Sequence, residues 1–196
     1  MCTYTYIAGC YTSNMYETNT GRFLDPSIVV SHFHLREGDV VAEFGAGSGH
    51  YMKPLSEAVG REGLVYMCEI QKPLVEALGT KAQSLRLSNV RTVWGDAEVL
   101  GGTKLRDASL DASLLSNTLF QISDKVNLFR ELHRVTRTGG KLFIIDWTGS
   151  FAGMGPKPED VVTEMEARTM AEREGFVYER FFPAGDHHYG IALRKQ

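Results

Sequence analysis

In the first half of the chain, acidic residues and one glycine-rich turn lie where parallel strands are expected to end. The turn Gly45–Gly49 has glycine at every second position and directly follows the apolar run Asp39–Phe44. Glycines at such a turn let a ligand approach the backbone closely. Glu69 ends the next apolar run and could accept hydrogen bonds from two ribose hydroxyls, and Asp96 follows the third run, where it could accept from an adenine amino group. Together these features indicate a nucleoside-type ligand.

The spacing of the glycines argues against two common phosphate-binding motifs. A dinucleotide fingerprint, GxGxxG, needs glycine at the position of His50, so a pyrophosphate at the helix start fits less well. The chain also contains no GxxxxGK[ST] sequence, which excludes a phosphate-binding loop of that kind more firmly.

A second set of polar residues lies close to the C-terminus. Asp186, His187, His188 and Tyr189 follow one another and offer a carboxylate, two imidazoles and a phenol. A metal site, a catalytic base and the polar start of a last strand all fit these residue types. Neighbouring side chains in a strand point to opposite faces, so the two histidines cannot readily bind one ion together.

Apolar runs and helical periodicity alternate along the chain, and this order predicts an α/β fold. Strands alternating with helices are typical of a doubly wound parallel sheet with helices on both faces, and a closing hairpin makes the last strand antiparallel. The expected strands are 39–44, 64–69, 90–94, 110–117, 141–147, 177–182 and 187–194. The expected helices are 25–33, 49–59, 73–85, 124–137 and 163–175.

Length and composition fit one domain with a substantial core. The chain has 196 residues, 43% of them hydrophobic, which suits a single domain over 25–196. The Tyr-rich stretch 1–24 has no persistent period and is interpreted as a poorly ordered extension, with an aromatic flap over a ligand as the alternative.

Charge and cysteine content narrow the class of protein. A formal net charge of −3 without a long basic run does not indicate an electrostatic grip on nucleic acid. The three cysteines, Cys2, Cys10 and Cys68, lack CxxC spacing, so a disulfide scaffold is disfavoured and a cytoplasmic location is expected. Neither a membrane-spanning run nor a signal-peptide layout is recognised.

Five stretches of the chain resemble successive motifs of class I S-adenosylmethionine (SAM)-dependent methyltransferases. They are VVAEFGAGSG, VYMCEI, WGDAE, LDASLLSNTLFQI and LHRVTRTGGKLFIIDW. The last is most similar to the small-molecule branch that includes the ubiquinone/menaquinone methyltransferases. The resemblance implies a Rossmann-like, seven-stranded sheet with its antiparallel last strand between the fifth and sixth. It also implies SAM as cofactor and methyl transfer to a small molecule by in-line displacement.

The resemblance assigns candidate cofactor contacts to single residues. Glu43 and the glycine turn would hold the methionine part, Glu69 the ribose, and the segment after the third strand the adenine edge. The complete set is Glu43, Gly45, Ala46, Gly47, Gly49, Glu69, Ile70, Asp96, Ala97, Ser116 and Asn117. Two departures from the family pattern are His50 after the last glycine and Thr138 where proline is frequent.

The catalytic candidates are His188, His187 and Asp146, which are expected near the acceptor. His188 is preferred as a base or hydrogen-bond partner, although a base is needed only when the acceptor holds a proton near neutral pH. No resident metal is predicted; a metal held by Asn117, Asp146 and one of the two histidines is the alternative. Two other functions stay open: an RNA methyltransferase and a non-catalytic cofactor-binding module. Neither the acceptor nor the oligomeric state follows from the sequence.

Overall fold

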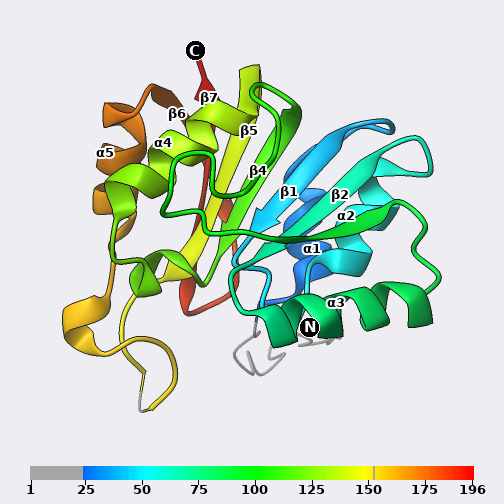
Figure 1. The fold of residues 1–196 in the computed structure, drawn as a ribbon. Helices are drawn as coiled ribbons and strands as arrows, with labels where there is room; N and C mark the ends of the chain where they lie inside the picture. Colours follow the sequence, from blue (N-terminus) through cyan, green and yellow to red (C-terminus); the bar gives the residue numbers. More distant parts are fainter. Residues whose placement is uncertain (1–23, 152) are drawn as a thin grey trace, which may run out of the picture.

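The computed structural model describes residues 24–151 and 153–196, and these form one seven-stranded sheet between two layers of helices (Figure 1). The proposed Tyr-rich extension lies outside the described residues except for Leu24. The strand order is β3-β2-β1-β4-β5-β7-β6. The neighbours β3, β2, β1, β4 and β5 pair in parallel, whereas β7 is antiparallel to both β5 and β6. The predicted insertion of an antiparallel last strand is confirmed.

The strands are β1 Val40–Phe44, β2 Leu64–Glu69, β3 Val90–Trp94, β4 Leu110–Ser116, β5 Thr136–Trp147, β6 Phe176–Pro183 and β7 His188–Lys195. The helices are α1 Pro26–Ser31, α2 Met52–Val59, α3 Lys72–Ser84, α4 Lys125–Val135 and α5 Glu164–Arg173, with the short 3-10 turns η1 Leu119–Gln121 and η2 Pro158–Asp160.

Alternation along the strands divides the core into two apolar layers. In β1, Val41 belongs to the cluster under α1, α2 and α3, whereas Ala42 and Phe44 belong to the cluster under α4 and α5. Successive side chains of a strand point to opposite faces, so a strand covered on both faces reads as one continuous apolar run. Because β1 to β5 pair in parallel, their carboxyl ends lie at one common edge of the sheet.

Local signals correctly predicted several helix starts. Asp25 precedes α1, and its side chain accepts a hydrogen bond from the backbone amide of Ser27 at 2.9 Å. Thr163 and Glu166 form the predicted capping box at the start of α5. Such caps satisfy backbone amides that the helix itself leaves without partners.

Several predicted boundaries are wrong. The helix expected over 49–59 begins only at Met52, because Gly49 has φ +70°, which a right-handed helix does not accommodate. The helix expected to reach 137 ends at Val135, and β5 begins at Thr136 rather than at 141. Thr136 is buried in the sheet, where its hydroxyl hydrogen-bonds that of Ser113 at 2.8 Å, so the sheet stabilises the extended form.

In residues 24–151 and 153–196, no helix combines the length and the apolar character that crossing a membrane requires.

Candidate active site

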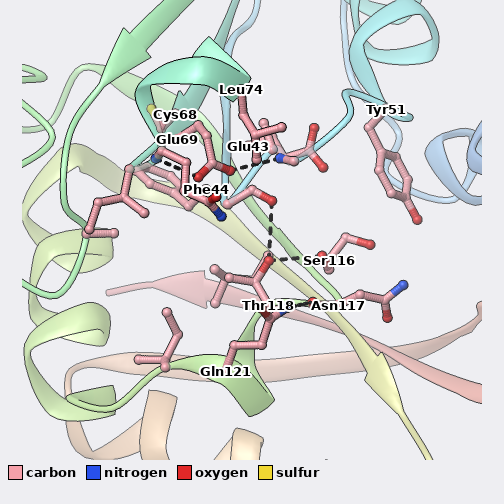
Figure 2. Close-up of a pocket in the computed structure, with 18 of the residues that line it drawn as sticks. Glu43, Phe44, Tyr51, Cys68, Glu69, Leu74, Ser116, Asn117, Thr118 and Gln121 are labelled. Atoms are coloured by element: carbon pink, nitrogen blue, oxygen red, sulfur yellow. Dashed lines mark hydrogen bonds between the residues drawn. The ribbon is translucent and has the colours of Figure 1, made fainter. Parts of the chain in front are cut away.

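A cavity of about 580 Å³ opens at the carboxyl ends of β1, β2 and β4 (Figure 2). Its walls come from the glycine turn after β1, the end of β2, the segment after β3, the segment after β4 and the residues at the start of α1. The volume lies within the range of roughly 300–1,000 Å³ typical of small-molecule sites. All of the predicted cofactor-binding residues line this cavity except Gly49.

The glycine turn has a backbone that requires glycine. Gly45, Gly47 and Gly49 have φ of +72°, +51° and +70°, in the left-handed region that other residues rarely adopt. A Cβ at Gly49 would lie 2.6 Å from Leu78 Cδ2, so this glycine lets the turn approach α3. A Cβ at Gly47 would meet no atom closer than the Gly45 carbonyl oxygen at 4.0 Å. Gly47 therefore leaves open space on the cavity wall.

Two side chains from elsewhere in the chain hold the turn in place. The Glu69 carboxylate, from the end of β2, accepts from the amide of Gly47 at 3.0 Å. Lys81, on α3, donates to the carbonyl oxygens of Ser48 and Gly49, both at 2.8 Å. Sequence analysis missed Lys81, since a single basic residue on a helix face carries no local signal for a contact with this turn.

Glu69 is buried but still offers acceptor capacity. Its side chain is 5% exposed, and its second oxygen accepts from the amide of Gln71 at 3.0 Å. A carboxylate has about four lone-pair positions, so two backbone amides leave room for further donors. Beside it, Ile70 is more than half exposed and presents an apolar surface to the cavity. This arrangement suits a sugar with two hydroxyls and an adjoining ring.

Glu43 has a free hydrogen-bonding position in the cavity. It is 3% exposed, and its Oε2 has no hydrogen-bond partner among the described residues. Burial raises the pKa of this carboxyl well above its usual value; the charge of Lys81 lowers it, and that of Glu69 raises it further. A buried polar atom without a partner costs free energy unless a ligand satisfies it. Glu43 therefore marks a place where a cationic or hydrogen-bond-donating ligand fits.

The cavity wall after β3 is anchored by a buried ion pair. Asp96 and Ala97 line the cavity, and the turn that follows them is held by Glu131 of α4. Glu131 is fully buried and accepts from the amides of Gly101 at 2.7 Å and Thr103 at 3.3 Å. The Thr103 hydroxyl and the Arg134 guanidinium donate to the same carboxylate. Burial opposes ionisation, but the hydrogen bonds from Arg134, Thr103 and Gly101 keep the pKa of Glu131 below its usual value.

We expect Glu131→Ala to lower the free energy of unfolding by about 3–5 kcal/mol, as removal of one partner of a buried ion pair typically does. It should also weaken ligand binding at Asp96, because the turn loses its anchor. Chemical denaturation measures the first effect. Glu57→Ala, which breaks an exposed pair with Lys53, is the control and should change stability by less than about 1 kcal/mol. Equal effects of the two substitutions would contradict the anchoring role of Glu131.

The three predicted catalytic residues do not line the cavity. Asp146 is 1% exposed, and its two oxygens accept from the amides of Leu119 at 2.9 Å and Trp147 at 2.8 Å. Burial raises the pKa of Asp146 to about 6, although those two amides lower it. Its carboxylate thus orders the turn between β4 and η1. Sequence analysis placed Asp146 correctly at the end of β5, but local pattern could not show which groups it would bind.

The two neighbouring histidines lie at the same edge of the sheet and contact different aromatic rings. β7 begins at His188, so the predicted start at His187 is wrong by one residue, and His187 lies in the preceding turn. The ring centroid of His187 lies 4.2 Å from that of Phe151, and the ring centroid of His188 lies 4.2 Å from that of Trp147. The Nε2 of His188 is buried without a hydrogen-bond partner, and burial lowers the pKa of this imidazole to about 4. His188 is therefore neutral near pH 7.

No group of three or more His, Cys, Asp or Glu side chains within residues 24–151 and 153–196 is arranged to hold a metal ion.

The fold and the cavity together define a class of protein. The cavity suits a nucleoside and has acidic residues at the carboxyl ends of β1, β2 and β3. The sheet has its antiparallel β7 between β5 and β6. This is the arrangement of a class I SAM-dependent methyltransferase. The profile of the Methyltransferase domain family matches residues 42–144. The chain belongs to this family, and its cofactor is SAM.

Known proteins with similar sequences or structures agree with this assignment. The crystal structure of a SAM-dependent methyltransferase from Aquifex aeolicus superimposes with a TM-score of 0.80 at 30% identity, covering 87% of this chain and 89% of that one. A ubiquinone/menaquinone biosynthesis C-methyltransferase from Legionella pneumophila is 29% identical over 125 residues, which are 63% of this chain and 49% of the relative. A demethylmenaquinone methyltransferase from Geobacillus stearothermophilus is 28% identical over 112 residues, 57% of this chain and 47% of the relative. The chain thus spans about half the length of these curated relatives.

Proposed function

We propose that the protein transfers the methyl group of SAM to an uncharged small molecule. The observation that carries this proposal is the charge of the cavity wall. Glu43, Glu69, Asp96 and Glu98 line it, whereas no Lys or Arg among the described residues does. Such a wall favours a cofactor whose sulfonium and ammonium groups outweigh its one carboxylate, and it opposes acceptors with many phosphates such as RNA.

The residues of the cavity suit the parts of SAM in chain order. Glu69 would bind the ribose hydroxyls. Asp96 and the backbone of Ala97 would bind the adenine edge. Glu43, whose Oε2 lacks a partner, and the glycine turn would bind the methionine part. The bound cofactor supplies an electrophilic methyl group on sulfur, so these residues have only to orient it and exclude water.

The relatives suggest which acceptor to test first. Those named above are a ubiquinone/menaquinone biosynthesis C-methyltransferase and a demethylmenaquinone methyltransferase. We therefore propose a quinol-type aromatic acceptor methylated on carbon. Similarity to only about half of each relative supports the methyl-transfer domain more directly than the choice of acceptor.

Calorimetric titration of the purified protein with SAM and S-adenosylhomocysteine tests the proposed function. Incubation with methyl-labelled SAM and a panel of quinols, followed by extraction of the labelled product, tests the transfer. Absence of binding at high micromolar cofactor would overturn the enzyme proposal. Binding without transfer to any quinol or to a cell extract would favour the non-catalytic cofactor-binding module instead.

We also propose a catalytic role at the acceptor for His188, His187 and Asp146. The unpartnered Nε2 of His188 supports this role. The absence of all three residues from the cavity wall opposes it. If it holds, His188→Ala or His187→Ala abolishes methyl transfer while the affinity for S-adenosylhomocysteine is unchanged. Single-turnover transfer assays and calorimetry measure the two effects. Full transfer by both variants would make the pair structural.

A further inference from the structure

Tyr51 brings a buried phenol to the cavity. The residue directly precedes α2, its ring belongs to the core, and it is 2% exposed. Its hydroxyl oxygen is buried and forms no hydrogen bond of good geometry with the described residues, although the Ser116 hydroxyl lies close enough to interact with it. Burial raises the pKa of Tyr51 above its ordinary value, although the neighbouring Ser116 hydroxyl lowers it. The phenol is therefore protonated near neutral pH and able to donate a hydrogen bond.

Asn117 offers a second unpartnered polar atom from the facing wall. It follows β4 directly and has φ +53°, a conformation that asparagine tolerates better than most residues. Its backbone is fixed on both sides: the amide donates to Ile145 at 2.9 Å, and the carbonyl accepts from Gln121 at 3.0 Å. The side-chain Oδ1 is nevertheless buried without a partner. The main chain is thus held in an unusual conformation while the amide side chain stays free.

These two groups lie at the end of the cavity away from the proposed ribose site. In Figure 2, Tyr51, Ser116 and Asn117 lie together on one side, and Glu69 and Cys68 lie on the other. The Tyr51 hydroxyl is close to Ser116 and feels the charges of Glu43 and Asp25. Beside Tyr51, the start of α1 adds apolar wall formed by Leu24 and Pro26.

The chemistry of this end selects a particular class of ligand. Two neutral polar groups on an apolar wall can form hydrogen bonds with a ligand that has one or two hydroxyl or carbonyl groups on an apolar body. Asp25 and Glu43 lie nearby, and no described Lys or Arg lines the cavity wall, so an anion bound at this end has no cationic partner there.

We propose that Tyr51 and Asn117 form the recognition pair for the methyl acceptor, and that they select an uncharged hydroxyl- or carbonyl-bearing molecule over its carboxylated analogue. This inference rests on the proposed function. It leaves the rest of the cavity to the cofactor and moves Asn117, which the family resemblance assigned to the cofactor, to the acceptor. It makes Tyr51 a specificity-determining residue that lies beside the cofactor candidates Glu43 and Ser116.

The test uses the full chain saturated with S-adenosylhomocysteine and two probes with the same rings, 2-naphthol and 2-naphthoate. Ligand-observed NMR titration near neutral pH measures the affinity of each. We expect the naphthol to bind at least about tenfold more tightly than the naphthoate, because the latter places a charge beside acidic residues without a cationic partner. Tyr51→Phe should weaken naphthol binding roughly threefold to tenfold, the loss typical of one hydrogen bond, with unchanged affinity for S-adenosylhomocysteine.

Two further variants complete the design. Asn117→Gly accepts the positive φ and removes the amide, so it should weaken naphthol binding to a similar degree. Tyr178→Phe, on β6, removes a phenol that does not line the cavity and should change nothing. Naphthol affinity that Tyr51→Phe leaves unchanged, or equal affinity for the two probes, would overturn the inference. Wild-type protein that fails to bind S-adenosylhomocysteine would instead overturn the proposed function.

Discussion

Glu69→Gln is expected to reduce the affinity for SAM by about a hundredfold or more. The carboxylate would accept hydrogen bonds from the ribose hydroxyls, and each hydrogen bond to a charged group contributes roughly 1.5–3 kcal/mol. Two such bonds correspond to at least about two orders of magnitude in the dissociation constant. The substitution also weakens the bond from the Gly47 amide that positions the glycine turn. Calorimetric titration with SAM measures the loss directly.

The matched control for this prediction is Glu76→Gln. Glu76 is exposed on α3 and does not line the cavity, so this substitution removes the same charge away from the site. SAM affinity should stay within about twofold of wild type, since an exposed charge is strongly screened. A Glu69→Gln variant that keeps its melting temperature and wild-type SAM affinity would show that the ribose is not bound at the end of β2.

Gly47→Ala is expected to weaken SAM binding by more than tenfold while the protein stays folded. The left-handed backbone costs about 1–2 kcal/mol with a Cβ present. The new methyl group itself meets no atom closer than 4.0 Å, so it occupies open space where the methionine part is expected to lie against the backbone. The change in SAM affinity should therefore exceed the change in stability, which calorimetry and urea denaturation measure separately.

Gly45→Ala distinguishes blocking of the site from damage to the turn. A Cβ at Gly45 would lie 2.5 Å from Thr118 Cγ2 and 2.6 Å from Thr118 Oγ1, so the turn and the segment after β4 have to move apart. This variant should lose more stability than Gly47→Ala. If Gly47→Ala binds SAM as tightly as wild type, the glycine turn does not hold the cofactor. If it is the less stable of the two, the assumed geometry of the turn is wrong.

The order of elements and most residues of the cavity wall followed from the sequence because their signals are local. Continuous apolar runs predicted strands buried on both faces, and Thr163 with Glu166 predicted the start of α5. Glu69 ends one such run, and Asp96 comes two residues after another. Because the ends of parallel strands meet at one edge, the topology alone brought them into one cavity. Helix ends were less predictable, since Thr136 takes the extended form only because β4 is there to pair with it.

Contacts between distant parts of the chain were decided by the tertiary structure alone. Lys81 binds the glycine turn from α3, and Glu131 binds the turn at Gly101 from α4. These contacts depend on how each helix docks on the sheet, which neither residue type nor spacing records. The same holds for the histidine pair, which the sequence placed correctly at the rim beside β5. The tertiary structure packs the two imidazoles against Trp147 and Phe151, and neither imidazole lines the cavity. It also buries a polar atom of Tyr51 and one of Asn117 in the cavity wall without a hydrogen-bond partner of good geometry among the described residues.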